Sequence, residues 1–163
     1  MDALSENAYR CLGEPTDGAG LYFLLNALRY LGLAEMGCSP GSLARFFQRL
    51  ARHTGIKEGD PILLWIAHTL EGRELEAVDE RLLRTWIRKV RRWCWRNGRI
   101  GWREVVRRLG PVTLTPTDLD VTLFLDSVDI RIRRIGLDLD PGWLPWFGRV
   151  VRFHYVDRRE FGA

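Results

Sequence analysis

The hydrophobic pattern of this 163-residue chain changes its period once, at Gly110-Pro111. Before that point apolar residues recur about every 3.6 residues, and after it they alternate with polar residues about every second position. Helices followed by strands are typical of an α+β domain, in which the helices pack on one face of a sheet. We therefore expect a single domain over 1–163, with a helical part at 1–110, a β part at 111–157 and a frayed tail at 158–163.

The helical part should form a bundle of about five helices. Gly20–Leu31 is apolar on nearly all sides, so it should lie centrally. Ser39-Pro40 and Asp60-Pro61 each combine a capping residue with a proline in the first turn, which favours a helix start at both positions. One core should contain residues from four of these helices: Leu24, Leu28, Phe46, Leu50, Leu63, Ile66, Trp86 and Val90.

The β part predicts four strands with one buried face each. They cover residues 112–115, 119–126, 128–133 and 150–155. Because the turn after Asp126 is short, the second and third strands should form a hairpin, and we expect a mainly antiparallel sheet packed on the bundle. Asp140-Pro141-Gly142 suits a type II turn, with glycine where φ must be positive. It leads into an apolar connection at 143–147.

Glu80–Asn97 predicts a helix with two unlike faces. At about 100° per residue, seven apolar residues share an arc of roughly 140°: Leu82, Leu83, Trp86, Ile87, Val90, Trp93 and Cys94. Basic residues occupy most of the rest, namely Arg81, Arg84, Arg88, Lys89, Arg91, Arg92 and Arg96. Trp95 falls in the middle of the basic arc, where a core residue has no reason to be. The helix should therefore present fixed positive charge and one indole to water.

Charge is segregated along the chain more strongly than its net value of +4 suggests. Residues 81–108 contain 11 Lys or Arg and one acid, whereas the remainder contains 14 basic and 20 acidic residues. Such segregation produces a local positive field. It favours an acidic protein partner or a nucleic-acid backbone, and the plain alternative is a solvated helix face.

Aromatic residues extend the candidate surface beyond this helix. Trp143 and Trp146 fit no core stripe, and exposed aromatic and arginine residues together are typical of interfaces. The alternative is that both fold back over the sheet as a lid. Our candidate partner-binding residues are Arg84, Arg88, Arg91, Arg92, Trp95, Arg96, Trp143 and Trp146.

Catalytic and metal-binding patterns are not recognisable in the sequence, so we expect no cofactor and no enzymatic activity. The three histidines, His53, His68 and His154, have no ligand spacing to one another or to cysteine. The segment Asp17–Gly20 lacks the Gly-Lys-Ser/Thr ending of a phosphate loop and is interpreted as a turn before a helix. The carboxylates between Asp118 and Asp140 could hold a metal, but nearby arginines favour a structural role.

The cysteines and the apolar stretches indicate a cytoplasmic protein without a membrane segment. Cys11, Cys38 and Cys94 are odd in number and widely spaced, which favours reduced thiols. Asn26 and Arg29 interrupt the longest apolar stretch, and the N-terminus does not have the pattern of a signal peptide.

Three segments resemble an uncharacterised bacterial family of longer proteins, associated with gene clusters for phage-tail-like contractile injection systems. They are GLYFLLNALRYLGL at Gly20–Leu33, DPILLWIAHTLEG at Asp60–Gly72, and DVTLFLDSVDIRIRRIGLDLDPGWLPWFGRVVRFHY at Asp120–Tyr155. The irregular end of the last segment is the most specific part. The resemblance implies an assembly or accessory role and no chemistry.

Taken together, these patterns predict a non-enzymatic accessory or scaffolding protein that binds an acidic surface of another protein. A winged-helix-like protein that binds a nucleic-acid backbone through residues 81–108 is the alternative. A hydrolase that uses the aspartate cluster is a third hypothesis. Few polar side chains that read bases lie on the basic face, so only backbone binding is compatible with the nucleic-acid hypothesis.

Overall fold

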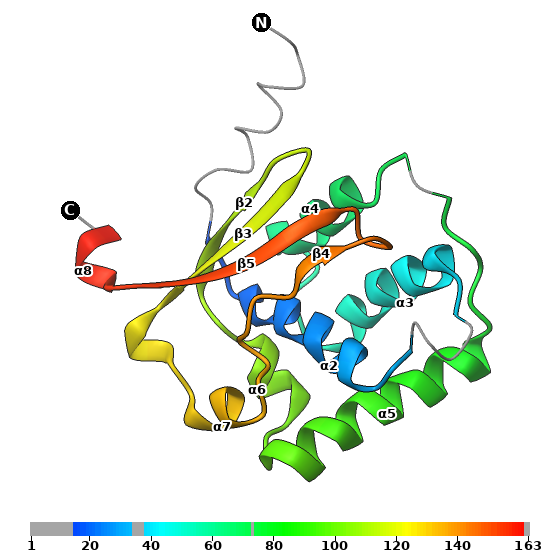
Figure 1. The fold of residues 1–163 in the computed structure, drawn as a ribbon, viewed down its shortest axis with the longest axis horizontal. Coiled ribbons are helices and arrows are strands. Elements are labelled where there is room, and N and C mark those ends of the chain that lie inside the picture. The colour runs from blue at the N-terminus through cyan, green and yellow to red at the C-terminus, as the bar shows by residue number, and fades with distance from the viewer. Residues whose placement is uncertain (1–14, 34–37, 73, 162–163) are drawn as a thin grey trace, which may run out of the picture.

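The computed structural model describes residues 15–33, 38–72 and 74–161. Within these ranges helices precede and flank a five-stranded sheet, which fits the α+β class (Figure 1). The helices are η1 (Ala19–Phe23), α2 (Leu24–Tyr30), α3 (Pro40–His53), α4 (Pro61–Thr69), α5 (Glu80–Gly98), α6 (Trp102–Val106), η2 (Leu125–Ser127), α7 (Ile130–Arg134) and α8 (Arg158–Phe161), where η marks 3-10 helices. The strands are β1 (Pro15–Thr16), β2 (Gly110–Leu114), β3 (Asp118–Phe124), β4 (Gly142–Leu144) and β5 (Arg149–Val156).

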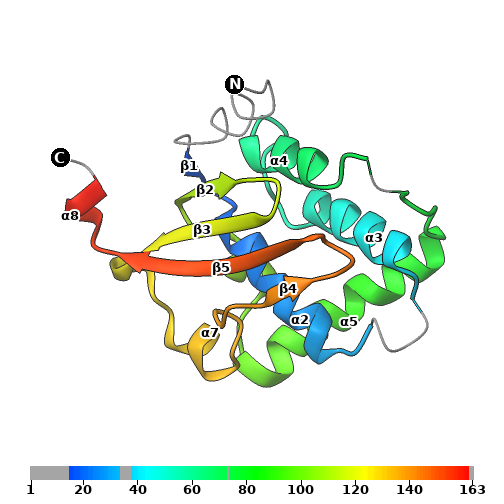
Figure 2. The same ribbon diagram turned by 45° about the horizontal axis from the view of Figure 1, so that its top comes forward.

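The sheet has the strand order β1-β2-β3-β5-β4, with β4 at the edge beside β5 (Figure 2). The neighbours β2 and β3 are antiparallel, as are β4 and β5, but the long central pair β3 and β5 is parallel, with Val121 opposite Phe153. Because the sheet has five strands, the predicted count of four is wrong. After β3 the chain passes through α7 and then β4, which runs opposite to β5. The strand β5 therefore has the same direction as β3.

The predicted strand at 128–133, and with it the predicted hairpin, is wrong because η2 ends β3 before this segment and the segment itself leads into α7. The Asp129 side chain caps α7 by accepting a hydrogen bond from the Arg131 backbone N–H at 2.9 Å. Ile130 is 59% exposed whereas Ile132 is 2% exposed, so the alternating apolar positions do not share one face. The described strands form hairpins at β2–β3 and at β4–β5 instead.

The segment expected to fray has helical structure over the residues that the structure describes. Residues 158–161 form α8, and the Arg158 guanidinium pairs with Asp126 at 2.8 Å. This ion pair ties the end of β5 to the turn that follows β3.

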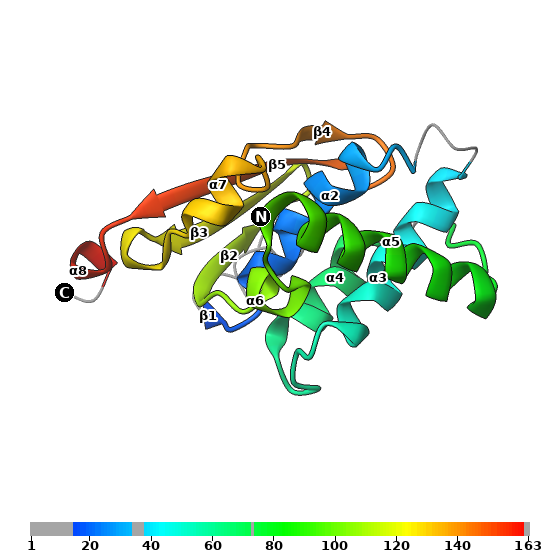
Figure 3. The same ribbon diagram turned by 90° about the horizontal axis from the view of Figure 1, so that it is seen from below.

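The core lies between the sheet and the helices, which occupy one side of it (Figure 3). The η1–α2 segment is central, as predicted, and Phe23 packs edge-on against Phe153 of β5 at a ring distance of 4.9 Å. Seven of the eight predicted core residues are buried, and Leu63 is partly buried against the same cluster.

The helix starts follow their capping residues. Ser39 accepts a hydrogen bond from the Ser42 N–H, and Asp60 accepts one from the Ile62 N–H, so α3 and α4 begin where Ser39-Pro40 and Asp60-Pro61 predict. None of the helices in the described ranges combines the length and apolar character needed to cross a bilayer.

Candidate functional site

Helix α5 is the longest helix in the described part of the chain, and local signals fix both of its ends. The Asp79 carboxylate accepts a hydrogen bond from the Arg81 N–H, which caps the first turn. At the other end Arg99 adopts a left-handed conformation with φ 51°, and its N–H donates to the Trp95 carbonyl at 3.0 Å. Within this helix, the rise of about 1.5 Å per residue puts Arg84 and Trp95 about 17 Å apart along the axis.

The apolar face of α5 is buried against α2 and the helices beside it. Trp86, only 4% exposed, packs edge-on against Phe46 of α3 at a ring distance of 4.9 Å. Trp93 is half-buried and stacks on Tyr30 of α2. Leu82, predicted for this face, is instead 42% exposed because it lies near the first turn, at the margin of the apolar arc.

The opposite face of α5 carries the predicted basic surface. Arg84, Arg88, Arg91, Arg92 and Arg96 are all exposed. Trp95 is 55% exposed among them, so neither β4 nor the C-terminal helix covers its ring. The prediction of an indole presented to water within a field of arginines is confirmed. We call these six residues the α5 face.

The arginines of the α5 face have no carboxylate partner among the described residues. Ion pairs with carboxylates occupy six arginines elsewhere in the described ranges: Arg49, Arg108, Arg131, Arg133, Arg152 and Arg158. The carboxylates of these pairs thus neutralise cations outside the α5 face. The α5 face retains charge that is available to an anionic surface.

A shallow groove of about 350 Å³ lies at the C-terminal half of the α5 face. It is lined by Arg88, Arg91, Arg92 and Trp95, together with Gly101 and Trp102 from the start of α6. The Arg91 guanidinium lies 5.7 Å from the centre of the Trp102 ring, and the Arg99 guanidinium lies 6.0 Å from that of Trp95. Both contacts are cation–π interactions, which hold the guanidinium groups beside the indoles.

These residue types bind rather than react. Guanidinium groups form bidentate hydrogen bonds with carboxylates and phosphates, and an exposed indole supplies apolar contact area. No side chain that lines the groove can act as a nucleophile or as a general base near neutral pH. Trp102 is buried, but it also forms part of the groove wall. Its place directly after the end of α5 is the sequence signal for that role.

The two remaining predicted site residues lie apart from the α5 face. Trp143 is on the edge strand β4 and is 58% exposed. Trp146 is half-buried and packs against Phe47 of α3 and its neighbour Phe147. It therefore joins the β4–β5 turn to the helical layer instead of covering the sheet as a lid. The structure thus brings six of the eight predicted residues together on α5, and the partner-binding role of all eight stays a prediction.

The aspartates between Asp118 and Asp140 are engaged by cations or by backbone groups. Arg152 of β5 bridges Asp118 and Asp120, and Asp120 also lies 2.7 Å from His154 Nε2. Burial raises the pKa of Asp120, but the hydrogen bonds from Arg152 and His154 outweigh it, so its pKa lies below the ordinary value. Among the residues that the structure describes, no three His, Cys, Asp or Glu side chains are grouped so that they could hold a metal ion.

The cysteines differ in their surroundings. Cys94 is fully buried on the apolar face of α5, and burial raises its pKa to about 12. Cys38 is half-buried before α3, and burial raises its pKa as well. Cys11 lies outside the described residues. Neither described thiol has the depressed pKa of a reactive cysteine.

Comparison of the chain with models of protein families, with curated proteins and with solved structures finds no match. The geometry of the α5 face and the chemistry of its residues are therefore the basis for a functional proposal.

Proposed function

We propose that this chain is a non-enzymatic accessory or scaffolding protein whose α5 face binds an acidic surface of a protein partner. The observation that carries the proposal is the combination, on a single helix face, of one exposed indole and five exposed arginines that have no carboxylate partner in the described part of the chain. An interface residue such as tryptophan can contribute about 2 kcal/mol or more to binding. Surrounding charges mainly steer association and fix orientation.

The proposed geometry places the indole at one end of the contact. Trp95 and the groove beside it would take an apolar side chain of the partner, while Arg84 and Arg88 would face its carboxylates along the helix. We propose a cytoplasmic setting, since reduced thiols suit the cysteine content. The further proposal that the partner belongs to a contractile injection assembly depends only on the resemblance of the three sequence segments.

Binding to a nucleic-acid backbone is the second candidate, because unpaired arginines spaced along a helix could contact successive phosphates. Two polar side chains near the face are already engaged by their own helix. Thr85 donates to the Arg81 carbonyl, and Asn97 donates to the Trp93 carbonyl. Their hydrogen bonds are used within α5, so recognition of base edges has little support and this candidate is limited to backbone binding.

Affinity capture with matched baits from the native host tests this proposal. The first bait is the native chain, and the second carries Arg88→Glu, Arg91→Glu and Arg92→Glu. A third bait makes the same charge change at exposed arginines outside α5, with Arg52→Glu, Arg134→Glu and Arg159→Glu. Each capture is made from untreated lysate and from lysate treated with nuclease.

We expect a protein with an acidic surface to be captured by the native and third baits and lost from the second. Cross-links from that protein should fall on α5 and α6. Retention of the same protein by the second bait would contradict the proposal. Loss of the captured protein from every bait after nuclease treatment would instead favour the nucleic-acid candidate.

A further inference from the structure

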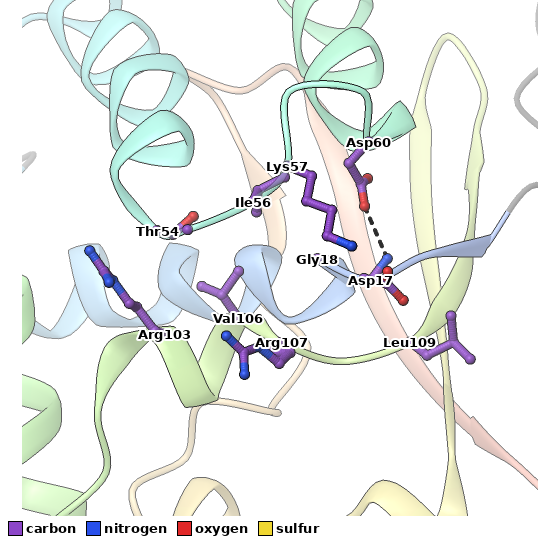
Figure 4. Close-up of a pocket in the computed structure, with 11 residues that line it drawn as sticks. Asp17, Gly18, Thr54, Ile56, Lys57, Asp60, Arg103, Val106, Arg107 and Leu109 are labelled. Atoms are coloured by element: carbon purple, nitrogen blue, oxygen red, sulfur yellow. Dashed lines mark hydrogen bonds between the residues drawn. The ribbon is translucent and has the colours of Figure 1, made fainter.

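A second cavity, of about 480 Å³, shares no lining residue with the groove. Three segments form its walls: the loop at 54–60 between α3 and α4, the turn at Asp17-Gly18 between β1 and η1, and residues 103–109 of α6 and the chain after it. Figure 4 shows these segments around the opening. The volume lies within the range of about 300–1,000 Å³ that is typical of small-molecule sites.

Three cations reach this cavity from two of its walls. Figure 4 shows Lys57 extending from the loop toward the turn at Gly18, with Arg103 and Arg107 on the α6 side. Arg103 and Arg107 are four residues apart, and the Arg103 stem lies beside Gly55, where an added Cβ would meet its Cδ at 3.7 Å. None of the three cations has a carboxylate ion-pair partner within the described ranges.

The carboxylate of Asp60 in the cavity wall is occupied by structural hydrogen bonds. It accepts from the Thr16 hydroxyl, from the Asp17 N–H at 3.1 Å and from the Ile62 N–H at 2.9 Å. Because Asp60 also caps α4, the positive end of that helix offsets part of its charge. Asp17 is the other carboxylate of the lining, so the cations outnumber the acids.

The cavity walls are tied together before any ligand arrives. The Asp60 contacts join the β1 turn to the start of α4, and the Ala19 N–H donates to the Arg108 carbonyl at 2.9 Å. The floor is apolar, with Ile56, Val106 and Leu109 in the lining. A site with fixed walls loses less free energy to ordering when a ligand binds.

We propose that this cavity binds a small organic phosphate monoester. The dianionic phosphate has three terminal oxygens that can accept hydrogen bonds from Lys57 and Arg107, and the organic group would contact Ile56, Val106 and Leu109. Arg103 extends away from these two cations and adds positive charge at the far end of the cavity (Figure 4). A carboxylate has only one charge and two oxygens, so it matches this positive lining less well. The site lies outside the α5 face and does not depend on the protein-partner proposal.

Titration of the isotope-labelled full chain with phenyl phosphate, benzoate and inorganic phosphate, followed by amide chemical shifts, tests this site. Phenyl phosphate should bind more tightly than either other probe, and the shifted amides should fall at 17–18, 54–60 and 103–109. Lys57→Gln and Arg107→Gln should each weaken it about tenfold, the loss of about one charge-assisted hydrogen bond. Leu109→Ser should weaken phenyl phosphate and spare inorganic phosphate.

Arg134→Gln is the matched control, because Arg134 is an exposed arginine that lines neither this cavity nor the groove on α5. It should leave the affinity for phenyl phosphate unchanged. The proposal is overturned if Arg134→Gln weakens binding as much as Arg107→Gln does. It is also overturned if benzoate or inorganic phosphate binds as tightly as phenyl phosphate, or if no probe shifts these amides.

Discussion

Truncating two tryptophans of the same helix, Trp86 and Trp95, should have opposite consequences for stability. They are nine residues apart, so at about 100° per residue they lie on opposite sides of the helix. Trp86 is 4% exposed and packs edge-on against Phe46, whereas Trp95 is 55% exposed and has Arg99 near its ring. The same chemical change therefore removes a core contact in one variant and a surface contact in the other.

The expected magnitudes differ by several-fold. Trp86→Ala should lower the free energy of unfolding by about 3–5 kcal/mol, because it loses apolar burial and leaves a cavity. For a chain of this size that corresponds to a fall in melting temperature of about 6–20 °C. Trp95→Ala loses at most an exposed cation–π contact, so its cost should be about 1 kcal/mol or less.

Chemical denaturation followed by far-ultraviolet circular dichroism measures both variants without depending on tryptophan fluorescence. If Trp86→Ala does not fold, Trp86→Phe keeps an aromatic ring against Phe46 and should give a smaller but measurable loss. A loss below about 1 kcal/mol for Trp86→Ala would refute the assigned orientation of α5. A loss for Trp95→Ala as large as that for Trp86→Ala would refute it equally.

Three further predictions concern packing, pH and salt. Gly20→Ala should lower the free energy of unfolding by about 3 kcal/mol or more in a denaturant titration, because the added Cβ would lie 1.9 Å from the Val105 carbonyl oxygen. Gly59→Ala should be nearly neutral, because its added Cβ would meet no atom of the described residues within 4 Å. Hydrogen bonds from Arg131 hold the pKa of Asp129 at about 2, below its ordinary 3.8. The stabilising contribution of the Asp129 carboxylate is therefore present above about pH 4 and is lost as pH falls toward 2. The difference in free energy of unfolding between the native chain and Asp129→Asn, measured by denaturation, should shrink from pH 6 to pH 3. Duplex or single-stranded nucleic acid should bind no more tightly than about 10 µM at physiological salt in an anisotropy titration, and submicromolar binding that reversal of the α5 arginines abolishes would favour the nucleic-acid candidate.

The parts of the fold that sequence predicts best are those set by local signals. Ser39 and Asp60 cap helices at the predicted positions, because their side chains accept hydrogen bonds from the first turn of the same helix. The two faces of α5 were also predictable, since a long segment samples the 3.6-residue period several times. Trp95 could be assigned to the surface for that reason.

The errors arise where the signal is short or non-local. The segment around Ile130 and Ile132 alternates like a strand, but five residues fit a single helical turn as well, and the Asp129 cap decides in favour of the helix. The parallel pairing of β3 with β5 depends on the path of the intervening chain, which no periodicity reports. The walls of the second cavity come from three segments distant in sequence, so that cavity could not be predicted. The groove is formed by residues 88–102, which are close in sequence, and the place of Trp102 directly after α5 was its only sequence signal.

The affinity of the captured partner for the native chain and for Trp95→Ala tests the central claim most directly. We expect Trp95→Ala to raise the Kd about thirtyfold or more, since about 2 kcal/mol of binding free energy is lost. The melting temperature of the variant should stay close to that of the native chain. An unchanged Kd, with or without a loss of stability, would contradict the claim that the exposed indole of α5 anchors a protein partner.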